Sequence, residues 1–279
     1  MIFYNNINQA EVSVIIPCYR CSRTVTRAIK SIMSQTIIPN EIILVDDCSG
    51  DDTWETLTSL RNIYGERIKV LQNSQNMGAA ASRNIGWNAS TQGLVAFLDA
   101  DDTWHSKKIE IQYFYMTKNP STFMSVHGFK IIKTSQSSLD WILPNAEVKE
   151  IKRLSLLLQN KFITPSVMIR RECKLRFNDK RRYMEDRLLW LEIICSGYKI
   201  IYIQMELAAI YKRSYGESGL SGNIFLMGIA DLQNYFIIYK KDLINIFEFI
   251  FLIIFSSIKF LKRIIFVYGF YKLTRIAIK

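Results

Sequence analysis

The first 100 residues alternate short apolar segments with longer amphipathic ones, and no other feature of the sequence limits the possible folds as strongly. The apolar segments are strand-like in length and in β-branched content, and they lie at residues 12–17, 41–45, 68–71 and 94–98. The segments between them carry apolar residues at helical spacing, at residues 22–35, 52–63 and 78–89. Strand and helix in regular alternation predict an α/β fold, a parallel sheet with helices on both faces.

Polar residues follow each of these four predicted strands. The clusters are CYR at 18–20, DDCSGDD at 46–52, QNSQN at 72–76 and DADD at 99–102. Ligands of parallel α/β sheets bind beyond the carboxyl ends of the strands. The four clusters are therefore expected to converge on one edge of the sheet and to form a binding site there.

The acidic turn at residues 99–102 suggests what that site binds. Asp99 and Asp101 can face one point, and two carboxylates held together without a cation repel each other. Mg²⁺ and Mn²⁺ relieve the repulsion, and they typically bind one or two carboxylates together with the oxygens of a bound diphosphate. The alternative is that these aspartates cap the helix that follows. A second acidic pair, Asp46-Asp47 at the end of another predicted strand, favours the metal site.

Five motifs between Val12 and Tyr211 occur in the order found in one enzyme family. They are VSVIIPCYR, ILVDDCSGDDT, NMGAAASRNIG, FLDADDTW and YMEDRLLW. In this order they resemble the inverting glycosyltransferases of family 2. The resemblance implies a GT-A fold, which has a Rossmann-like, mostly parallel sheet flanked by helices, and an enzyme that uses a nucleotide sugar.

The resemblance also implies where the nucleotide lies. Pro17 and Tyr19 are expected to line the nucleotide pocket. Asp47 is expected to hold the base, and Arg83 to contact the nucleotide. Because an aspartate in this position holds uracil in similar enzymes, a UDP-sugar is the expected donor.

Metal binding and catalysis follow from the same resemblance. Asp99 and Asp101 form the DxD element, which holds Mn²⁺ or Mg²⁺. We expect Asp101 to bind the metal, Asp99 to contact the ribose or the metal, and Asp102 to be a second candidate ligand. Asp186 occupies the position of the general base, with Glu185 beside it.

An acceptor hydroxyl is a poor nucleophile, so a carboxylate must take its proton as the bond to the sugar forms. The leaving nucleoside diphosphate gains charge, which a metal can stabilise. The alternative for Glu185-Asp186 is a solvated helix start, where acids favour the N-terminal dipole. No Q-x-x-R-W motif follows the acidic pair, and this predicts addition of one sugar rather than a polymer.

Residues 223–279 form a basic and apolar tail with eight Lys or Arg and three Asp or Glu. If residues 243–267 are helical, the helix carries a narrow polar stripe within a broad apolar surface. The stripe comprises Glu248, Ser256, Lys259 and Arg263, and the apolar surface includes Phe247, Phe251, Phe255 and Ile258. Such a helix is expected to lie in the headgroup region of an anionic membrane. The alternatives are a helix buried against the catalytic domain, a dimer contact and a transmembrane hairpin.

The predicted domains are a GT-A domain at residues 1–222 and the tail at 223–279, separated at the glycine-rich segment 216–223. The nucleotide-binding half is expected at about 11–103 and the acceptor half at about 104–222. The chain begins without a basic start and apolar run, and its five cysteines cannot all pair, so a reducing cytoplasm is expected.

By resemblance, the acceptor is expected to be an undecaprenyl-diphosphate-linked saccharide of O-antigen or capsule synthesis. The enzyme would then work as a peripheral protein at the cytoplasmic face of the inner membrane. Two other classes remain. A nucleotidyltransferase would need a glycine-rich loop where the chain has PCYRCSRT. A non-catalytic basic protein that binds membranes or nucleic acid would explain the net charge of +11, but it would not need Asp47, Asp101 and Asp186 in separate loops, so no nucleic-acid partner is expected.

Overall fold

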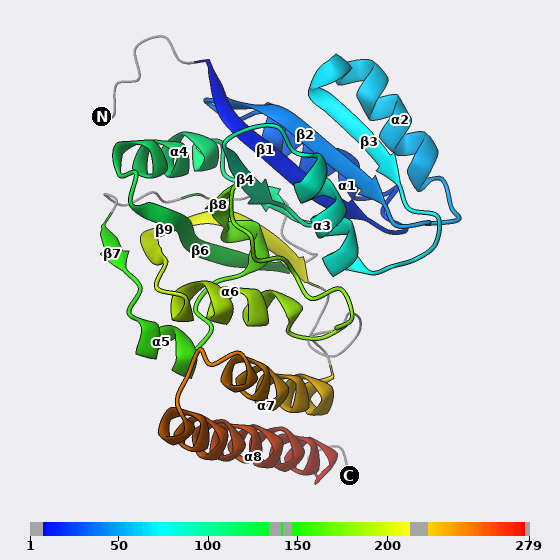
Figure 1. Ribbon diagram of the computed structural model, residues 1–279. Coiled ribbons are helices and arrows are strands. Elements are labelled where there is room, and N and C mark those ends of the chain that lie inside the picture. The colour runs from blue at the N-terminus through cyan, green and yellow to red at the C-terminus, as the bar shows by residue number, and fades with distance from the viewer. Residues whose placement is uncertain (1–7, 134–140, 142–146, 213–222, 277–279) are drawn as a thin grey trace.

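The computed structural model describes residues 8–133, 141, 147–212 and 223–276. In these residues nine strands form one sheet, in the order β3-β2-β1-β4-β8-β6-β9-β5 with β7 paired to β9 (Figure 1). The strands are β1 (Gln9–Cys18), β2 (Ile38–Asp46), β3 (Ile68–Gln72), β4 (Leu94–Phe97), β5 (Thr103–Trp104), β6 (Thr122–Lys133), β7 (Val148–Glu150), β8 (Met168–Arg170) and β9 (Lys199–Lys212). The helices are α1 (Val25–Met33), α2 (Thr53–Tyr64), α3 (Ala79–Ala89), α4 (Lys108–Lys118), α5 (Arg153–Leu158), α6 (Glu185–Cys195), α7 (Ile224–Lys240) and α8 (Ile246–Ile276).

The first half of the sheet is parallel, as the alternating pattern predicts. β1 pairs with β2 on one side and with β4 on the other, and β2 pairs with β3. All four strands end at the same edge, which carries the polar clusters. The predicted α/β fold of GT-A type is confirmed.

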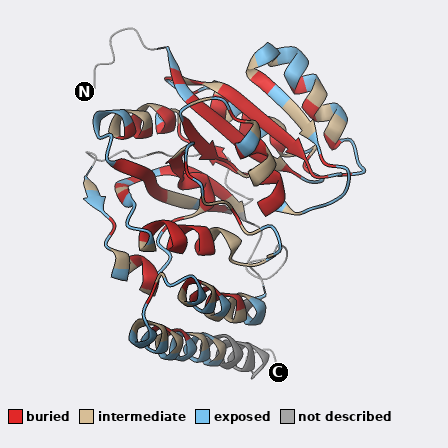
Figure 2. Ribbon diagram, in the orientation of Figure 1, coloured by how far each residue is buried: buried red, intermediate tan, exposed pale blue. Residues whose placement is uncertain are grey.

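Two hydrophobic cores cover the two faces of this sheet. Figure 2 shows that its central strands are buried. Successive side chains of a strand point to opposite faces, so Ile15 of β1 joins the core beneath α3 and α6, while Val14 and Ile16 join the core beneath α1, α2 and α4. α1 shows the matching helical pattern, because its buried residues Val25, Ala28, Ile29 and Ile32 recur at intervals of three and four.

Helix α3 approaches β1 closely at Gly86. A Cβ atom added at this residue would lie 2.5 Å from Cγ2 of Ile15 and 3.3 Å from Cγ2 of Val45. Both neighbours are branched side chains within packed strands, so they cannot give way cheaply. The glycine lets α3 lie against the sheet and so fixes the position of Arg83 on the same helix.

We expect Gly86→Ala to lower the free energy of unfolding by about 1–3 kcal/mol, the usual cost of overpacking, even though Ala has the better helix propensity. Gly93→Ala is the matched control, because a Cβ there meets no atom within 4 Å. Urea unfolding of the two variants measures the difference. Equal stabilities would contradict the close approach of α3.

For the second half of the domain, the sequence predicts helices at 107–116 and 185–195 and a strand at 199–203. The structure differs from this expectation in the strands. β9 continues to Lys212 rather than ending at 203, because it pairs in parallel with β6 as far as Lys133. The short strands β5 and β7 also add to β9, and neither was predicted. The predicted helices at 107–116 and 185–195 are confirmed as α4 and α6.

A buried basic pair lies between α4 and β6. His127 is 0% exposed, and its Nδ1 lies 2.7 Å from the carbonyl oxygen of Gly128. Lys108 is also fully buried, with Nζ 3.7 Å from the centroid of the Trp104 ring. Burial and then the charge of Lys108 lower the pKa of His127 from 6.5 to about 3. His127 is therefore neutral in the folded protein at neutral pH.

The stability of the protein is expected to fall as the pH drops below 6.5. The folded pKa of His127 lies below its ordinary value, so unfolding takes up a proton between pH 6.5 and about 3. At pH 5 this corresponds to about 2 kcal/mol relative to pH 7. Denaturant unfolding of the wild type and of His127→Gln at pH 7 and pH 5 measures it, and the variant should lose that part of the decline. The same decline in both proteins would contradict the assignment.

Helices α7 and α8 pack below α6 (Figure 1). On their inner side, Tyr235, Ile238, Ile244 and Leu252 belong to the same hydrophobic core as Trp190 of α6. The domain boundary at 222 stays a prediction, because residues 213–222, which include all of the glycine-rich segment except Asn223, lie outside the described part of the chain.

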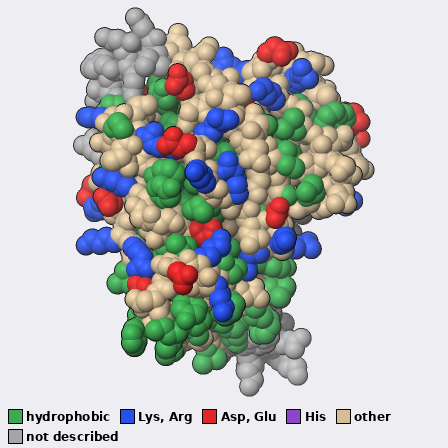
Figure 3. Space-filling view, viewed as in Figure 1, with side chains coloured by type: hydrophobic (Ala, Val, Ile, Leu, Met, Phe, Trp, Pro, Cys, Tyr) green, Lys and Arg blue, Asp and Glu red, His purple; other side chains and the backbone are tan. Residues whose placement is uncertain are grey.

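Helix α8 places part of the expected polar stripe against the rest of the protein. Glu248 and Ser256 of the expected polar stripe point into the protein, where they bond to Arg153 and Asp231. The outward stripe is mainly apolar and exposed; it comprises Ile246, Phe247, Ile250, Phe251, Ile254, Ile258, Leu261 and Ile265. Figure 3 shows apolar side chains gathered at this end of the molecule, over α7 and α8. In the described residues, no helix combines the length and the apolarity needed to cross a membrane.

Candidate active site

Asp46 and Asp47, at the end of β2, organise the loops of the binding edge. Asp46 accepts hydrogen bonds from Ser49 and from Nε2 of Gln72, at 3.0 Å for the latter. Asp47 accepts from Nδ2 of Asn73 at 2.8 Å. Both aspartates are almost fully buried. They tie the loop after β2 to the loop after β3.

Asp47 also fixes the beginning of α3. Its two carboxylate oxygens accept from the backbone N–H of Met77 at 2.8 Å and of Gly78 at 2.7 Å. Asp47 is 2% exposed, so a base could contact its carboxylate only if these hydrogen bonds changed. In this structure Asp47 shapes the edge; its predicted contact with a base stays a prediction.

Tyr19 presents an exposed aromatic ring at the carboxyl end of β1. The residue is 46% exposed, and the guanidinium carbon of Arg20 lies 5.3 Å from the centroid of its ring. The backbone N–H of Arg20 donates to Oγ of Ser49 at 3.0 Å, which joins this loop to the one after β2. Pro17 is partly exposed beside them. An open ring beside Pro17 suits the predicted nucleotide pocket.

The three aspartates of the turn after β4 have different surroundings. Asp101 is exposed, and the side chain of Asp99 is 33% exposed. Asp102 is buried and its Oδ1 accepts from the backbone N–H of Tyr211 on β9 at 3.3 Å, which makes it the poorest of the three as a metal ligand. The cap of α4 is Lys107, and no side chain makes a capping bond there. The alternative that these aspartates cap the helix is therefore wrong.

Arg83 connects this turn to the start of α6. Its Nη2 lies 2.7 Å from Oδ1 of Asp99, and its Nη1 lies 3.4 Å from Oε1 of Glu185. The side chain of Arg83 is 7% exposed. Burial by itself would lower the pKa of Arg83, but the nearby carboxylates of Asp99, Glu185 and Asp186 outweigh it and raise the pKa. Arg83 is thus a buried cation that holds the two acidic groups together, a role that the predicted nucleotide contact does not include.

Glu185 and Asp186 differ in their electrostatic surroundings. Burial, followed by the charge of Asp186, raises the pKa of Glu185 to about 7, although Arg83 opposes the shift. Asp186 is half-buried, and its Oδ2 accepts from Oγ1 of Thr164 at 3.1 Å. No sequence motif marked Thr164, which reaches the acidic pair from a 3₁₀ turn at Thr164–Ser166. A strongly perturbed acid beside a hydrogen-bonded carboxylate is typical of a catalytic site.

The side chains available as ligands determine whether a metal ion fits this site. In the described residues, no group of three or more His, Cys, Asp or Glu side chains is arranged so that it could hold a metal ion by itself. A Mg²⁺ or Mn²⁺ ion that takes one or two carboxylates and completes its shell with diphosphate oxygens and water needs no such group. Asp101 and Asp99 supply accessible carboxylates at the edge where the parallel strands end, so they fit an ion that arrives together with the nucleotide sugar.

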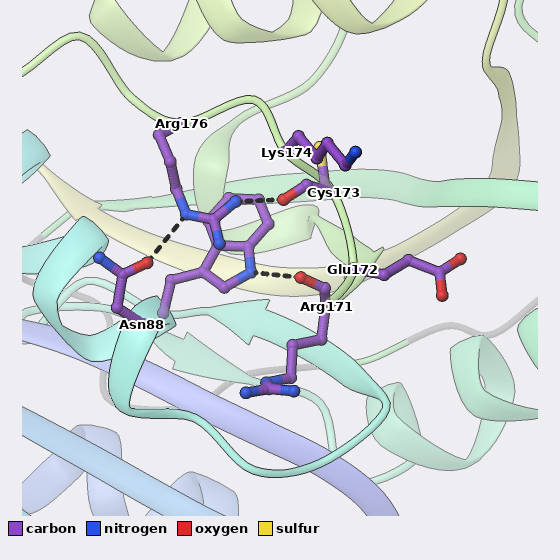
Figure 4. A pocket seen from close by; sticks show the side chains of 7 residues that line it. Asn88, Arg171, Glu172, Cys173, Lys174 and Arg176 are labelled. Carbon is purple, nitrogen blue, oxygen red and sulfur yellow. Dashed lines mark hydrogen bonds between the residues drawn. The ribbon is translucent and has the colours of Figure 1, made fainter.

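A cavity of about 300 Å³ lies elsewhere, between α3 and the segment that follows β8 (Figure 4). Its polar groups already pair with one another: Trp87 donates from Nε1 to the carbonyl of Arg171, and Arg176 donates from Nε to Oδ1 of Asn88. The guanidinium of Arg176 also lies over the Trp87 ring, 4.4 Å from its centroid. We therefore place the site at the acidic edge and not in this cavity.

Comparison with known proteins agrees with the resemblance of the motifs to family 2 glycosyltransferases. The family model Glycosyl transferase family 2 matches residues 13–175. The Escherichia coli UDP-Glc:alpha-D-GlcNAc-diphosphoundecaprenol beta-1,3-glucosyltransferase WfaP is 30% identical over 190 residues, which are 67% of this chain and 72% of that protein. A second Escherichia coli protein of the same description, WfgD, is 31% identical over 202 residues, 68% of this chain and 77% of that protein.

This chain is also similar to a glycosyltransferase of another bacterium and to a solved structure. The putative teichuronic acid biosynthesis glycosyltransferase TuaG of Bacillus subtilis is 32% identical over 189 residues, 67% of this chain and 73% of that protein. Among solved structures, S. aureus TarS 1–349 in complex with UDP-GlcNAc superposes with a TM-score of 0.61 at 18% identity. The match covers 80% of this chain and 66% of that one, and it is a likeness of fold.

Proposed function

Because this chain belongs to glycosyl transferase family 2 and is a glycosyltransferase, we propose that it transfers one sugar, with inversion, from a nucleotide sugar to a lipid-linked saccharide. One observation carries the proposal. Arg83 holds Asp99 of the turn after β4 and Glu185 at the start of α6 in one buried ion-pair cluster, with Asp186 adjacent. Asp99 of the proposed donor-binding turn is thereby linked through Arg83 to the helix start that carries the candidate base.

The relatives support the finer identity of donor and acceptor. The printed names of WfaP and WfgD describe transfer from UDP-Glc to a GlcNAc-diphosphoundecaprenol. We take the donor of this chain to be a UDP-sugar and its acceptor an undecaprenyl-diphosphate-linked saccharide of bacterial surface polysaccharide synthesis. Tyr19 and Pro17 would lie against the nucleoside, and Arg83 lies close enough to the acidic edge to influence the diphosphate.

The proposed chemistry is a single displacement. Asp186 accepts the proton of the acceptor hydroxyl while that oxygen bonds to the anomeric carbon of the donor sugar. The bond from that carbon to the diphosphate breaks on the opposite face, so the configuration inverts. A Mn²⁺ or Mg²⁺ ion held by Asp101 and Asp99 would supply Lewis-acid stabilisation to the departing diphosphate. Thr164 orients the carboxylate of Asp186.

A sugar-nucleotide panel tests the function. Purified full-length protein is incubated with each donor, Mn²⁺ and a short-chain polyprenyl-diphosphate GlcNAc acceptor, and released nucleoside diphosphate is measured. We expect release with a UDP-sugar, stopped by EDTA and strongly reduced in Asp101→Ala. Release of pyrophosphate would instead indicate a nucleotidyltransferase, and a long polymer from one donor would overturn the single addition.

We propose a peripheral position on the cytoplasmic side of the inner membrane, and the outer face of α8 supports the membrane contact. Phe247 is 80% exposed and Ile254 55% exposed, and both belong to the continuous apolar stripe. Lys259, Lys262 and Arg263 are exposed at the same helix. An apolar stripe beside cations matches a bilayer surface that carries anionic lipid.

We expect the full-length protein to float with vesicles that contain phosphatidylglycerol and to float several-fold less after the paired change Phe247→Ser and Phe251→Ser. Ile63→Ser on α2 is the control, because Ile63 is also an exposed apolar residue, at 71%, but lies outside the stripe. Flotation that is equal in all three proteins would contradict a membrane-binding face. So would a stable dimer that the paired change dissociates, since the stripe would then bind a second copy.

A further inference from the structure

The first turn of α6, which carries Glu185 and Asp186, is held from outside the sheet. Met184, directly before it, has a left-handed backbone with φ 55° and ψ 26°. This conformation costs a residue other than glycine about 1 kcal/mol or more, so neighbouring contacts must hold it. The contact comes from α7: Nδ2 of Asn234 donates to the carbonyl oxygen of Met184 at 3.0 Å. Asn234 is 0% exposed.

The other side of the acidic pair is held by α7 as well. Nε of Arg187 lies 2.6 Å from Oδ1 of Asp231, and Nη2 of Arg187 donates to the hydroxyl of Tyr235 at 2.9 Å. The side chains of Arg187 and Asp231 are 2% and 8% exposed. An ion pair this deeply buried and also hydrogen-bonded fixes the geometry of the residues that carry it.

Helix α8 supports α7 from behind. The second oxygen of Asp231 accepts from Oγ of Ser256 at 2.8 Å and lies 3.4 Å from Nζ of Lys259. The two helices also approach closely at Gly228, where an added Cβ would lie 2.3 Å from the ring of Phe260. Asp231 is therefore shared between α6 and α8.

We propose that Asn234 and Asp231 are positioning residues of the transfer reaction. Asn234 sets the backbone before Glu185, Asp231 holds the residue after Asp186, and α7 thereby directs the carboxylate of Asp186 toward the acceptor hydroxyl. The inference rests on the proposed role of Asp186. Its consequence is that the C-terminal helices, besides offering a membrane-binding face, complete the active site.

A kinetic comparison tests the positioning role in the full-length protein. Asn234→Ala removes the donor to Met184, and Asp231→Asn removes the charge that pairs with Arg187. Glu248→Gln is the matched control, because it breaks the ion pair of α8 with Arg153 on α5, which lies at the C-terminal end of α6 near Cys195 and away from the first turn of α6. A misplaced catalytic group costs on the order of 10²-fold in rate, so we expect kcat to fall about 10- to 100-fold in the first two variants, with the donor KM within about twofold. Glu248→Gln should keep kcat within about twofold.

Hydrogen–deuterium exchange gives a second readout that does not depend on turnover. Amides of residues 181–190 should exchange faster in Asn234→Ala and Asp231→Asn but not in Glu248→Gln. Equal losses of kcat in all three variants, or unchanged exchange in the first two, would overturn the positioning role. If the wild type turned over no donor, the proposed function would fail, while the exchange measurement would still decide whether α7 holds this turn. Should one variant not fold, the other carries the same comparison.

Discussion

Asp186→Asn is expected to lower kcat for sugar transfer by about 10²- to 10⁴-fold, the usual contribution of a general base. The amide has the shape of the carboxylate: its oxygen can accept from the backbone N–H of Arg187, and its NH2 group can donate to Oγ1 of Thr164, so the fold and the donor site should persist. The donor KM is therefore expected to stay close to that of the wild type. Single-turnover transfer from a labelled UDP-sugar to a polyprenyl-diphosphate acceptor measures the rate, and donor affinity is measured separately.

Glu185→Gln is the control for this assignment. Glu185 has the more strongly perturbed surroundings, with its pKa raised to about 7, and it lies within 3.4 Å of Arg83. A group paired to a buried cation is better suited to hold that cation than to receive a proton from substrate. We therefore expect Glu185→Gln to cost less rate than Asp186→Asn. A larger loss in Glu185→Gln would move the role of base to Glu185.

Periodicity predicted the parallel half of the fold because its strands are buried on both faces and its helices bury one regular stripe each. The same reasoning could not find the full length of β9 or the existence of β5 and β7. Strand pairing with β6 and β9 creates these elements, and pairing depends on residues far away in the chain. Local pattern carries no information about it.

Sequence motifs likewise predicted some residues of the candidate site and missed others. Motifs located the acidic turn and Asp186, and the structure brings Asp99 near Glu185 through Arg83. Motifs did not locate Thr164, Asn234 or Asp231, which lie in segments without any recognisable pattern. These residues act through hydrogen bonds that only the folded chain creates.

Helix α8 shows a further limit of sequence patterns. A helical projection separated its polar and apolar stripes correctly, but it could not say which stripe faces the protein. Arg153 and Asp231, on two other helices, bond to Glu248 and Ser256 and so turn this half of the polar stripe inward, whereas Lys259 and Arg263 are exposed. The partners of a stripe, and not its composition, decide its orientation.

Arg83→Gln is expected to abolish most transfer activity and also to destabilise the protein. The change leaves the carboxylates of Glu185 and Asp99 without their cation, and removing one partner of a buried ion pair costs about 3–5 kcal/mol. The lower end of that range applies, because the side chain of Asp99 is 33% exposed and can be hydrated. The repulsion should also displace Asp186, so kcat is expected to fall at least about 10²-fold. Chemical unfolding and transfer assays measure the two effects.

The double variant Arg83→Gln with Asp99→Asn separates charge from geometry. Removing the carboxylate along with the cation relieves the unpaired charge, so the double variant should be more stable than Arg83→Gln alone, by about 1–2 kcal/mol. Its transfer rate should not recover, because the contact between the turn after β4 and the start of α6 is still missing. Additive losses of stability would show that Arg83 and Asp99 act independently. The cluster that joins the turn after β4 to the start of α6 would then lack its central contact.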